Sequence, residues 1–339
     1  MLTAEQIAER IAERASTTAT YRHIEPLAAV AARASEGLLL PDGIGLGLPD
    51  IDVRTRGFRA NDLVLITGFS HSGKTQLVNT MILNNPQKRI LFISIDDPAE
   101  MILIKLLAMR AGTSAEEIER LARNGDIDIT QMFTTFAEEY PNLIVVDKRL
   151  DIKRMNEAVD EAKHQWGTNP DAVVIDYLEL IPAGTITGES ELTGVKAKAT
   201  ELQTWAKRNP WPTIVLHQGT RSNARPGEPI TIMSLAYGGE QQASIIIGVR
   251  RKRDRADLEP DDRAFHQDTV TLHIVKNKRP GGKLTNYDGI DFWMEPDTGR
   301  IRQIGTADRR QASVVTTVER VRELAGPPRQ RPDYQTEAF

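Results

Sequence analysis

The sequence contains no cysteine, and this absence removes several kinds of chemistry. Disulfide bonds, thiolate metal sites and cysteine nucleophiles are all excluded, which fits a reducing compartment. The chain also lacks an apolar run long enough to span a membrane, and its N-terminal segment MLTAEQIAERIAER is amphipathic rather than typical of a signal peptide. We therefore expect a cytoplasmic protein with no membrane partner.

A large excess of charge of either sign is also missing. The 339 residues carry a formal net charge of −4, so the whole molecule is not a general polyanion binder. Any contact with nucleic acid must come from local basic patches. Apolar residues make up 40% and charged residues 27%, as in an ordinary globular protein, and no internal repeat is present. The length allows one large α/β domain with flanking segments, or two small domains.

Short apolar runs alternate with helical patterns in the middle of the chain, and the runs predict strands that are covered on both faces. These runs are residues 63–67, 89–95, 143–147, 172–176, 213–217 and 244–249. Strands that alternate with helices predict an α/β fold with a mainly parallel central sheet. One such helix is expected to begin after Pro98 and to end at Gly112. After Thr269 the pattern changes and predicts C-terminal β-hairpins.

The two ends of the chain differ in composition from this α/β region. Residues 1–43 predict a short N-terminal helical arm that ends in a loop rich in glycine and proline. Residues 44–305 form the expected main domain. Residues 306–339 predict one helix, at 311–325, followed by a polar, proline-rich tail without fixed structure.

The segment GFSHSGKT, residues 68–75, matches the phosphate-binding pattern G-x-x-x-x-G-K-[ST]. It follows an expected strand and precedes a helical pattern, and a plain glycine-rich turn would have this context only by accident. Its glycines allow backbone N–H groups to surround phosphates at the start of a helix. Lys74 would reach the β- and γ-phosphates of ATP, and the Thr75 hydroxyl would bind Mg²⁺. The residues expected to bind the nucleotide are Gly68, Ser70, Ser72, Gly73, Lys74 and Thr75.

Carboxylates at the ends of two other strands complete the expected site. Asp176 ends the run AVVID, where a carboxylate can hold Mg²⁺ through a water. Asp96 and Asp97 follow the strand after the phosphate-binding helix, at the edge where a parallel sheet meets its ligands. We assign Asp96 to orient the attacking water and Asp97 to cap the next helix, although both could serve only the helix start. Glu179 is expected to be a surface or capping carboxylate.

Four segments together carry a family resemblance: GFSHSGKT, RILFISIDDPAEMILIKLLA, DAVVIDYLELI and TIVLHQGTRS. Their order and spacing over roughly 44–305 resemble the C-terminal motor domain of the DnaB-type replicative helicases. The resemblance implies a RecA-like P-loop NTPase core that uses ATP and Mg²⁺. It also implies a homohexamer that moves on single-stranded DNA and unwinds duplex at a replication fork. Residues 1–43 are too short for the family's primase-binding domain, as in compact phage and plasmid relatives, and leave loader and primase partners open.

The resemblance also assigns catalytic roles outside the P-loop. Gln218 takes the place of the family's γ-phosphate sensor, although the residue alone would indicate only a polar strand end. The basic turn VKNKRPGGK resembles the hairpin that sends a Lys-x-Arg pair into the neighbouring subunit's ATP site. Lys276 and Lys278 occupy the positions of that pair, and Arg279 comes one residue later. The cation that enters the neighbouring ATP site, here called the cationic finger, is either Lys278 or Arg279 presented by a bulge. We favour Arg279, because a guanidinium binds phosphate at two points.

Two segments resemble regions that face DNA in the ring's central channel: residues 222–244 and the loop 183–196. The residues expected to contact DNA are Arg221, Arg225, Tyr237, Gly238, Gly239 and Lys196. The glycines would allow close approach of the backbone to a phosphodiester chain. Tyr237 could equally be a packing residue, and Lys196 with Lys198 could equally form a solvated helix face.

Two further features depart from the family. Asp96 stands where the family has Glu, so the attacking water must sit closer or turnover will be slow. The basic run RRKRDR at 250–255 is an addition, which we expect to be a solvated loop balanced by nearby carboxylates rather than a DNA contact.

Two rival functions remain at this stage. A recombinase or another RecA-like filament protein would share the core, but the trailing basic hairpin and LHQGTRS argue against it. An ATP-binding scaffold or loader without unwinding activity is kept open by Asp96 and by the displaced arginine. Measured ATP turnover separates the scaffold from a motor.

Overall fold

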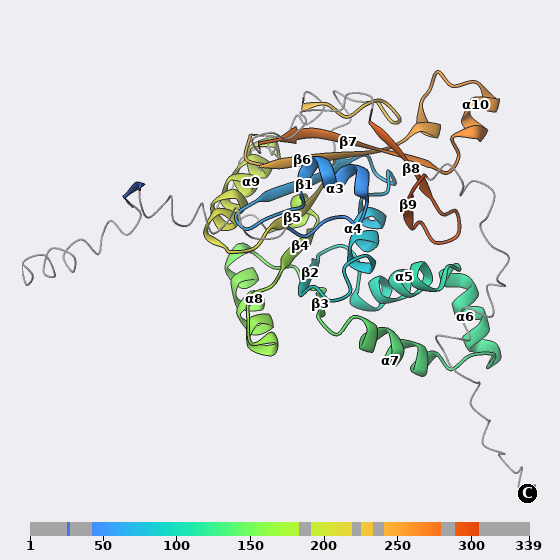
Figure 1. Cartoon of the computed structure of the whole chain (residues 1–339), viewed down its shortest axis with the longest axis horizontal. Helices are drawn as coiled ribbons and strands as arrows, with labels where there is room; N and C mark the ends of the chain where they lie inside the picture. The colour runs from blue at the N-terminus through green and yellow to red at the C-terminus, as the bar shows by residue number, and fades with distance from the viewer. Residues whose placement is uncertain are drawn as a thin grey trace, which may run out of the picture. The chain divides into compact units, whose positions relative to one another are not determined.

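The structure is a computed structural model that describes residues 26–27, 43–182, 191–218, 225–232, 241–278 and 289–304. The chain divides into two compact units, Met1–Asp42 and Gly43–Phe339. Residues 26 and 27 alone represent the first unit, so the predicted arm helices lie outside the described residues. The predicted helix at 311–325 and the tail lie outside them as well. The second unit holds all the elements described below (Figure 1).

A mixed sheet forms the centre of the second unit. In the described residues it has nine strands, in the order β3-β2-β4-β5-β1-β6-β7-β8-β9. The strands are β1 (Leu63–Gly68), β2 (Ile90–Ser94), β3 (Leu143–Val146), β4 (Ala172–Asp176), β5 (Thr213–Gln218), β6 (Ile245–Arg251), β7 (Thr269–Asn277), β8 (Ile290–Met294) and β9 (Ile301–Gln303). Neighbours from β3 to β6 in this order are parallel, and β7, β8 and β9 are antiparallel. The predicted strands, the mainly parallel sheet and the C-terminal hairpins are thereby confirmed.

Helices cover both faces of the parallel strands (Figure 1). Val64 and Ile66 of β1 lie in one buried cluster with α4, α5, α6 and α7, whereas Leu65 lies in the other with α8 and α9. This alternation follows from the two-residue repeat of a strand. The helices are α3 (Pro49–Thr55), α4 (Lys74–Leu83), α5 (Ala99–Ala111), α6 (Ala115–Asn124), α7 (Ile129–Glu139), α8 (Ile152–Trp166), α9 (Glu191–Arg208) and α10 (Pro260–Phe265), with 3-10 turns η2 (Leu178–Leu180) and η4 (Lys252–Asp254). Among the described residues, no helix combines the length and the apolar character needed to cross a membrane.

The start of α5 corrects one prediction. The helix begins after Pro98 and ends at Gly112, as expected, but Asp97 is not its cap. The backbone N–H of Ala99 instead donates to the carboxylate of Asp147, just past β3, over 3.1 Å. The carboxylate of Asp97, which lies before the helix, pairs with the ammonium of Lys105 inside it at 2.5 Å. A cap supplied from a separate strand is invisible to local sequence patterns.

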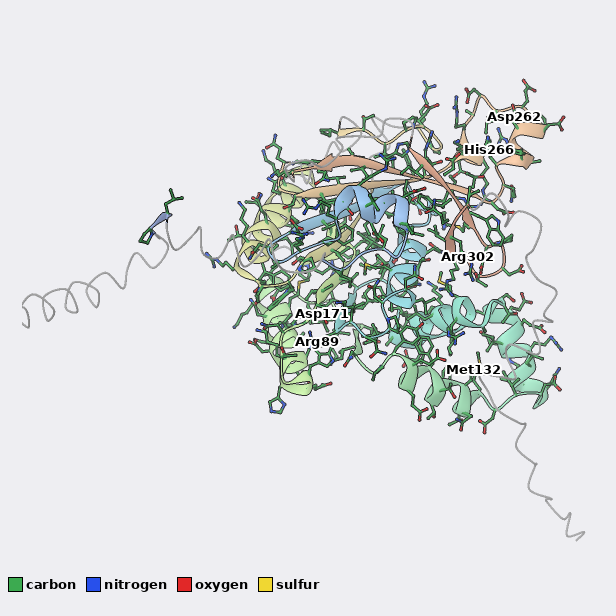
Figure 2. All side chains as sticks on the ribbon, viewed as in Figure 1. Arg89, Met132, Asp171, Asp262, His266 and Arg302 are labelled. Carbon is green, nitrogen blue, oxygen red and sulfur yellow. The ribbon has the colours of Figure 1, made fainter. Side chains whose placement is uncertain are left out.

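The amino ends of β2 and β4 are joined by an ion pair. Arg89 and Asp171 precede these strands, and their side chains meet at 3.0 Å (Figure 2). The backbone N–H of Arg89 also donates to Asp171 over 2.8 Å. Both side chains are partly exposed, so the pair contributes little stability. Its position agrees with the register that places Ser94 opposite Asp176 at the other end of these strands.

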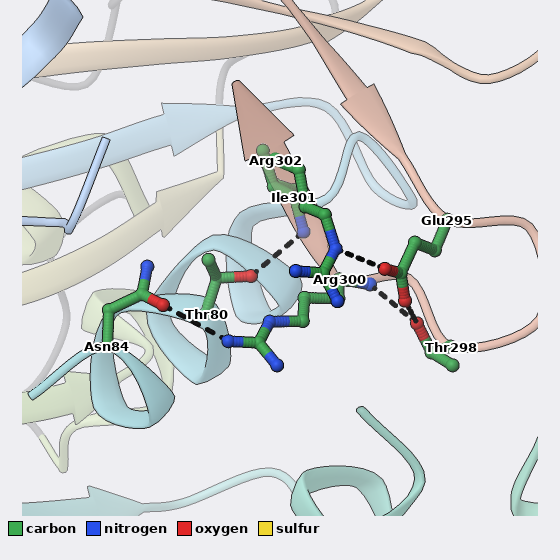
Figure 3. A network of polar contacts seen from close by, with 7 residues as sticks. All are labelled: Thr80, Asn84, Glu295, Thr298, Arg300, Ile301 and Arg302. Atoms are coloured by element: carbon green, nitrogen blue, oxygen red, sulfur yellow. Dashed lines mark hydrogen bonds and ion pairs between the residues drawn. The ribbon is translucent and has the colours of Figure 1, made fainter. Parts of the chain in front are cut away.

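The last hairpin is attached to α4, the helix that follows the P-loop (Figure 3). The N–H of Ile301 on β9 donates to the buried hydroxyl of Thr80 over 3.0 Å. The guanidinium of Arg300 donates to the side-chain oxygen of Asn84 over 3.2 Å. These contacts hold α4 between the parallel sheet and the C-terminal hairpin, and thereby fix the direction in which its N-terminus points.

Candidate nucleotide-binding site

The P-loop turn between β1 and α4 requires both of its glycines. Gly73 has a φ of 105°, which a residue with a side chain rarely adopts. A Cβ on Gly68 would lie 2.4 Å from the main-chain oxygen of Val249 on β6. Ser70 is exposed, whereas Ser72 is buried and its hydroxyl has no hydrogen-bond partner among the described residues. The turn is therefore a narrow cradle lined by main chain, as a bound phosphate requires.

Lys74 lies with its ammonium inside this turn. Its Nζ donates to the main-chain oxygens of Gly68 and Phe69, at 2.9 Å each. Burial lowers the pKa of Lys74, and the negative charges of Asp176 and Glu179 oppose this change. A partly desolvated cation attracts anions more strongly than one in water. The ammonium is thus placed to exchange two carbonyl oxygens for the oxygens of a phosphate chain.

Thr75 and Asp176 meet beside the lysine. The hydroxyl of Thr75 donates to Asp176 Oδ2 over 3.1 Å, although 101 positions separate them in the chain. Hydroxyl and carboxylate oxygens are ligands that Mg²⁺ accepts, with waters and substrate phosphates completing its shell. No group of three or more acidic, histidine or cysteine ligands exists in the described part of the chain. The donor set therefore fits Mg²⁺ bound together with a nucleotide rather than in a cage of protein ligands.

Burial raises the pKa of Asp176 to about 6, and the nearby charge of Asp96 adds to this effect. The Thr75 hydrogen bond and the Lys74 charge act in the opposite direction. Because the pKa is higher in the folded than in the unfolded state, the stability linked to this group is complete below pH 3.8 and is lost as the pH rises through about 6. Ionised Asp176 therefore destabilises the protein when no cation is bound.

We expect Asp176→Asn to raise the free energy of unfolding at pH 8, in EDTA, by about 3 kcal/mol. The gain should shrink to about 1.5 kcal/mol at pH 5, where the wild-type carboxyl is mostly protonated. Urea denaturation at the two pH values measures both quantities. Glu157→Gln is the control, because Glu157 is exposed on α8. This substitution should change the free energy of unfolding at neither pH. Equal stability of Asp176→Asn and wild type at pH 8 would contradict the prediction.

The carboxyl ends of the central strands bring the other predicted residues to the same edge. Asp96 is exposed two residues past the end of β2, and its charge raises the pKa of Asp176. Gln218 ends β5 and pairs in register with Gly68, the first glycine of the P-loop. Lys74, Asp176, Asp96 and Gln218 are thus gathered at one edge, as ligand sites of open α/β sheets usually are.

One residue of this edge was placed wrongly from the sequence. Glu179 on η2 is neither a surface residue nor a helix cap, because its side chain is only 21% exposed and faces the end of β5. Its Oε1 accepts the backbone N–H of Gln218 over 2.9 Å and lies 2.7 Å from Nδ1 of the buried His217. The sequence feature that could have indicated this position is a charged residue within the apolar stretch YLELI, three positions after Asp176.

The basic residues of β7 lie away from this edge. Lys276 is opposite Ile246 on β6, and Ile246 is beside Leu65 on β1, so the register places Lys276 several residues before the P-loop end of the sheet. Lys276 and Lys278 both point an ammonium at the main-chain oxygen of Gln241, at 3.3 and 3.5 Å. The structure does not bring them to the phosphate site of their own chain.

Strand β7 has a register irregularity of its own before the lysines of the basic turn. Lys276 is opposite Ile246 and Ile274 is opposite Ile247, so the register shifts at Val275, before both lysines. Arg279 lies outside the described residues. The choice between Lys278 and Arg279 stays a prediction.

The residues expected to contact DNA are described only in part. Lys196 is exposed on α9, and Arg225 is exposed in a segment that Arg250 holds by donating to the oxygen of Gly227 over 2.8 Å. Lys198 donates instead to the main-chain oxygen of Glu179 over 2.8 Å, inside the molecule. The others lie outside the described residues: Arg221, Tyr237, Gly238 and Gly239.

The basic run at 250–255 is only partly the solvated loop that was expected. Strand β6 extends to Arg251, and the side chains of Arg250 and Arg251 are buried. Arg251 donates to the main-chain oxygen of Gln267 over 2.7 Å, and burial lowers its pKa. Only the exposed end fits the prediction, where Arg255 pairs with Asp257 at 2.5 Å. The first two arginines act in packing because distant segments cover them.

Comparison with known proteins finds several curated replicative DNA helicases that are similar in sequence to part of this chain. It is 26% identical over 210 residues to the replicative DNA helicase DnaB of a Nostoc species, covering 57% of this chain and 22% of that protein. The Haemophilus influenzae DnaB is 25% identical over 234 residues, covering 62% and 46%. A probable replicative DNA helicase of Trieres chinensis is 25% identical over 258 residues, covering 70% and 53%. The chain thus spans about half or less of the length of these relatives.

Solved structures show the same fold. The chain matches a structure described as an ATPase domain with a TM-score of 0.67 and 18% identity, covering 82% of this chain and 98% of that one. A DnaB-like replicative helicase described with its primase interactions matches with a TM-score of 0.66 and 18% identity, covering 88% and 72%. The family model for the DnaB-like helicase C-terminal domain matches residues 43–287, well over half of the sequence. This protein therefore belongs to the DnaB-like helicase C-terminal domain family.

Proposed function

We propose that this chain is the ATP-hydrolysing motor of a ring-forming replicative DNA helicase, which translocates on single-stranded DNA in the cytoplasm. The observation that carries the proposal is the contact between Thr75 and Asp176 beside Lys74, within a chain of this helicase family. A cation-binding pair next to a partly buried lysine and a glycine cradle is the arrangement that phosphoryl transfer from ATP requires.

The chemistry of the site follows from the residues present. Lys74 would bind the β- and γ-phosphates, and Thr75 with Asp176 would hold Mg²⁺, which neutralises charge on those phosphates. Asp96 is exposed at the same edge and would orient the attacking water. Gln218, next to Gly68, would sense the γ-phosphate through its amide group. These roles need no residue from outside the carboxyl edge of the sheet, except for a cation opposite the γ-phosphate.

The positions of Lys276 and Lys278 support a ring. Since Lys276 and Lys278 lie away from their own P-loop, they would act in the site of another subunit. A head-to-tail interface in which one subunit completes the next either closes into a ring or opens into a helix, and we propose a closed hexamer. Lys196 and Arg225 are exposed and would contact the phosphates of single-stranded DNA without reading its sequence.

The test is ATP hydrolysis with and without single-stranded DNA, followed by unwinding of a forked duplex. We expect DNA to stimulate hydrolysis by the wild type. Lys74→Ala should lower kcat by about 10²- to 10³-fold, because one preorganised cation that stabilises the transition state is removed. Lys207→Ala is the control, as an exposed lysine at the end of α9, and it should keep wild-type turnover.

Hydrolysis that DNA does not stimulate, or a wild type that never unwinds a fork, would contradict the helicase proposal. Strand exchange between homologous duplexes would instead support a recombinase, with the same P-loop in a filament. Nucleotide binding without turnover would support an assembly scaffold.

A further inference from the structure

The end of β5 extends past its neighbour β4. The register pairs Ile175 with Val215, so β4 ends at Asp176 while β5 continues to His217 and Gln218. On its other side, β5 is paired with β1 up to its last residue. Backbone N–H groups at such an edge need another acceptor, because an unpaired buried group costs stability. The residue that ends β5 therefore depends on a partner from outside the sheet.

Glu179 supplies that partner from the turn η2, which follows β4. Its Oε1 accepts the backbone N–H of Gln218 over 2.9 Å. The same oxygen lies 2.7 Å from Nδ1 of His217, whose side chain is completely buried. The carboxylate thus takes the place of the missing β4 residues and contacts both residues at the end of β5.

The turn that carries Glu179 is held in its own right. Lys198 on α9 donates to the main-chain oxygen of Glu179 over 2.8 Å. The guanidinium of Arg149 donates to the main-chain oxygen of Leu180 over 3.1 Å. Contacts at the main chain and at the carboxylate therefore leave Glu179 little freedom. Its carboxylate can thus hold the end of β5 in one position.

The alternation of side chains shows what this fixed position controls. Ile214 and Leu216 of β5 lie in the buried cluster that includes α4, whereas Val215 lies in the cluster on the opposite face. By the same alternation, Gln218 directs its side chain to the α4 face, where the P-loop ends, and His217 directs its side chain away. A shift of the Gln218 backbone would therefore move its amide relative to the phosphates.

We propose that Glu179 is a positioning residue for Gln218, and that it sets the rate of ATP hydrolysis rather than the affinity for ATP. The inference rests on the proposed function, since Gln218 is the sensor only in a chain that hydrolyses ATP. The carboxylate does not touch substrate. It acts by holding the backbone from which the sensing amide projects.

The test compares kcat and KM for ATP with single-stranded DNA present. Glu179→Ala should lower kcat by about 10- to 100-fold, since a small misplacement of a catalytic group costs that much, and should leave KM within about threefold. Glu179→Gln keeps an oxygen that accepts the N–H of Gln218, so it should retain kcat within about threefold of wild type. Glu157→Ala, an exposed carboxylate on α8, is the matched control.

Adding Glu179→Ala to Gln218→Ala should cause no further loss of kcat, because the two residues act as one unit. Independent losses in the double variant, or a kcat of Glu179→Ala equal to wild type, would overturn the inference while leaving the ATPase proposal intact. Loss of folding in Glu179→Ala, seen by circular dichroism, leaves Glu179→Gln as the deciding variant, and a large kcat loss there overturns the inference. A wild type without turnover overturns the proposed function, and this inference with it.

Discussion

Asp96→Asn should lower the rate of ATP hydrolysis by about 10²- to 10⁴-fold, the range lost when a general base is removed. The side chain is exposed two residues past β2, and the register places the end of β2 beside Asp176 at the end of β4. Asp96 therefore lies at the same edge of the sheet as Thr75 and Asp176 without contacting either of them through a hydrogen bond in the described residues. An amide in the same position can still accept a hydrogen bond from water but can take no proton. Nucleotide affinity should stay within about threefold, because Lys74 and Thr75 are unchanged.

Asp96→Glu tests whether the short side chain of Asp96 limits its action as the base. The family that this chain resembles has Glu at this position, so the longer side chain should keep or raise turnover. Asp97→Asn is the matched control, because Asp97 pairs with Lys105 and has no predicted contact with water or phosphate. Steady-state assays measure the rate of ATP hydrolysis, and equilibrium binding of a fluorescent ATP analogue measures the nucleotide affinity. Full turnover in Asp96→Asn would show that another group is the base.

The strands and the P-loop could be predicted because each depends on a short stretch of sequence. A strand covered on both faces is a continuous apolar run wherever it occurs in the sheet. The turn from Gly68 to Lys74 needs a φ of 105° at Gly73 and a close approach of main chain at Gly68, and each of these two requirements favours glycine. The parallel order then brings Asp176 to Thr75, since the carboxyl ends of parallel strands meet at one edge.

The errors concern residues whose partners come from distant segments. Asp147 caps α5 from 48 positions away in the chain, and this partner displaces the cap expected from Asp97. Arg250 and Arg251 read as part of a solvated basic loop, yet main-chain oxygens of Gly227 and Gln267 pair with them inside the molecule. A charged residue is buried only where such partners exist, and the composition of its own segment does not reveal them.

Removing the cationic finger should have the largest effect on turnover. A finger supplied in trans is worth about 10³- to 10⁵-fold in kcat, so the single change among Lys276→Ala, Lys278→Ala and Arg279→Ala that causes such a loss identifies it. We favour Arg279, because a guanidinium contacts phosphate at two points and an ammonium cannot. Size-exclusion chromatography with light scattering should show that each variant keeps the oligomeric state of the wild type, which we propose is a ring. Uniformly small losses would place the finger elsewhere.

Mixed rings decide whether the finger acts on a neighbour. The register of β7 puts Lys276 and Lys278 away from their own P-loop, so a subunit without a finger still has an intact P-loop face. An Asp96→Asn subunit has the opposite defect, with an intact finger beside an inactive site. When the two inactive variants are mixed, some interfaces combine an intact P-loop face with an intact finger, and ATP hydrolysis should return. A finger that acted within its own subunit could not restore activity, because every subunit in the mixture would carry one defect in its own site.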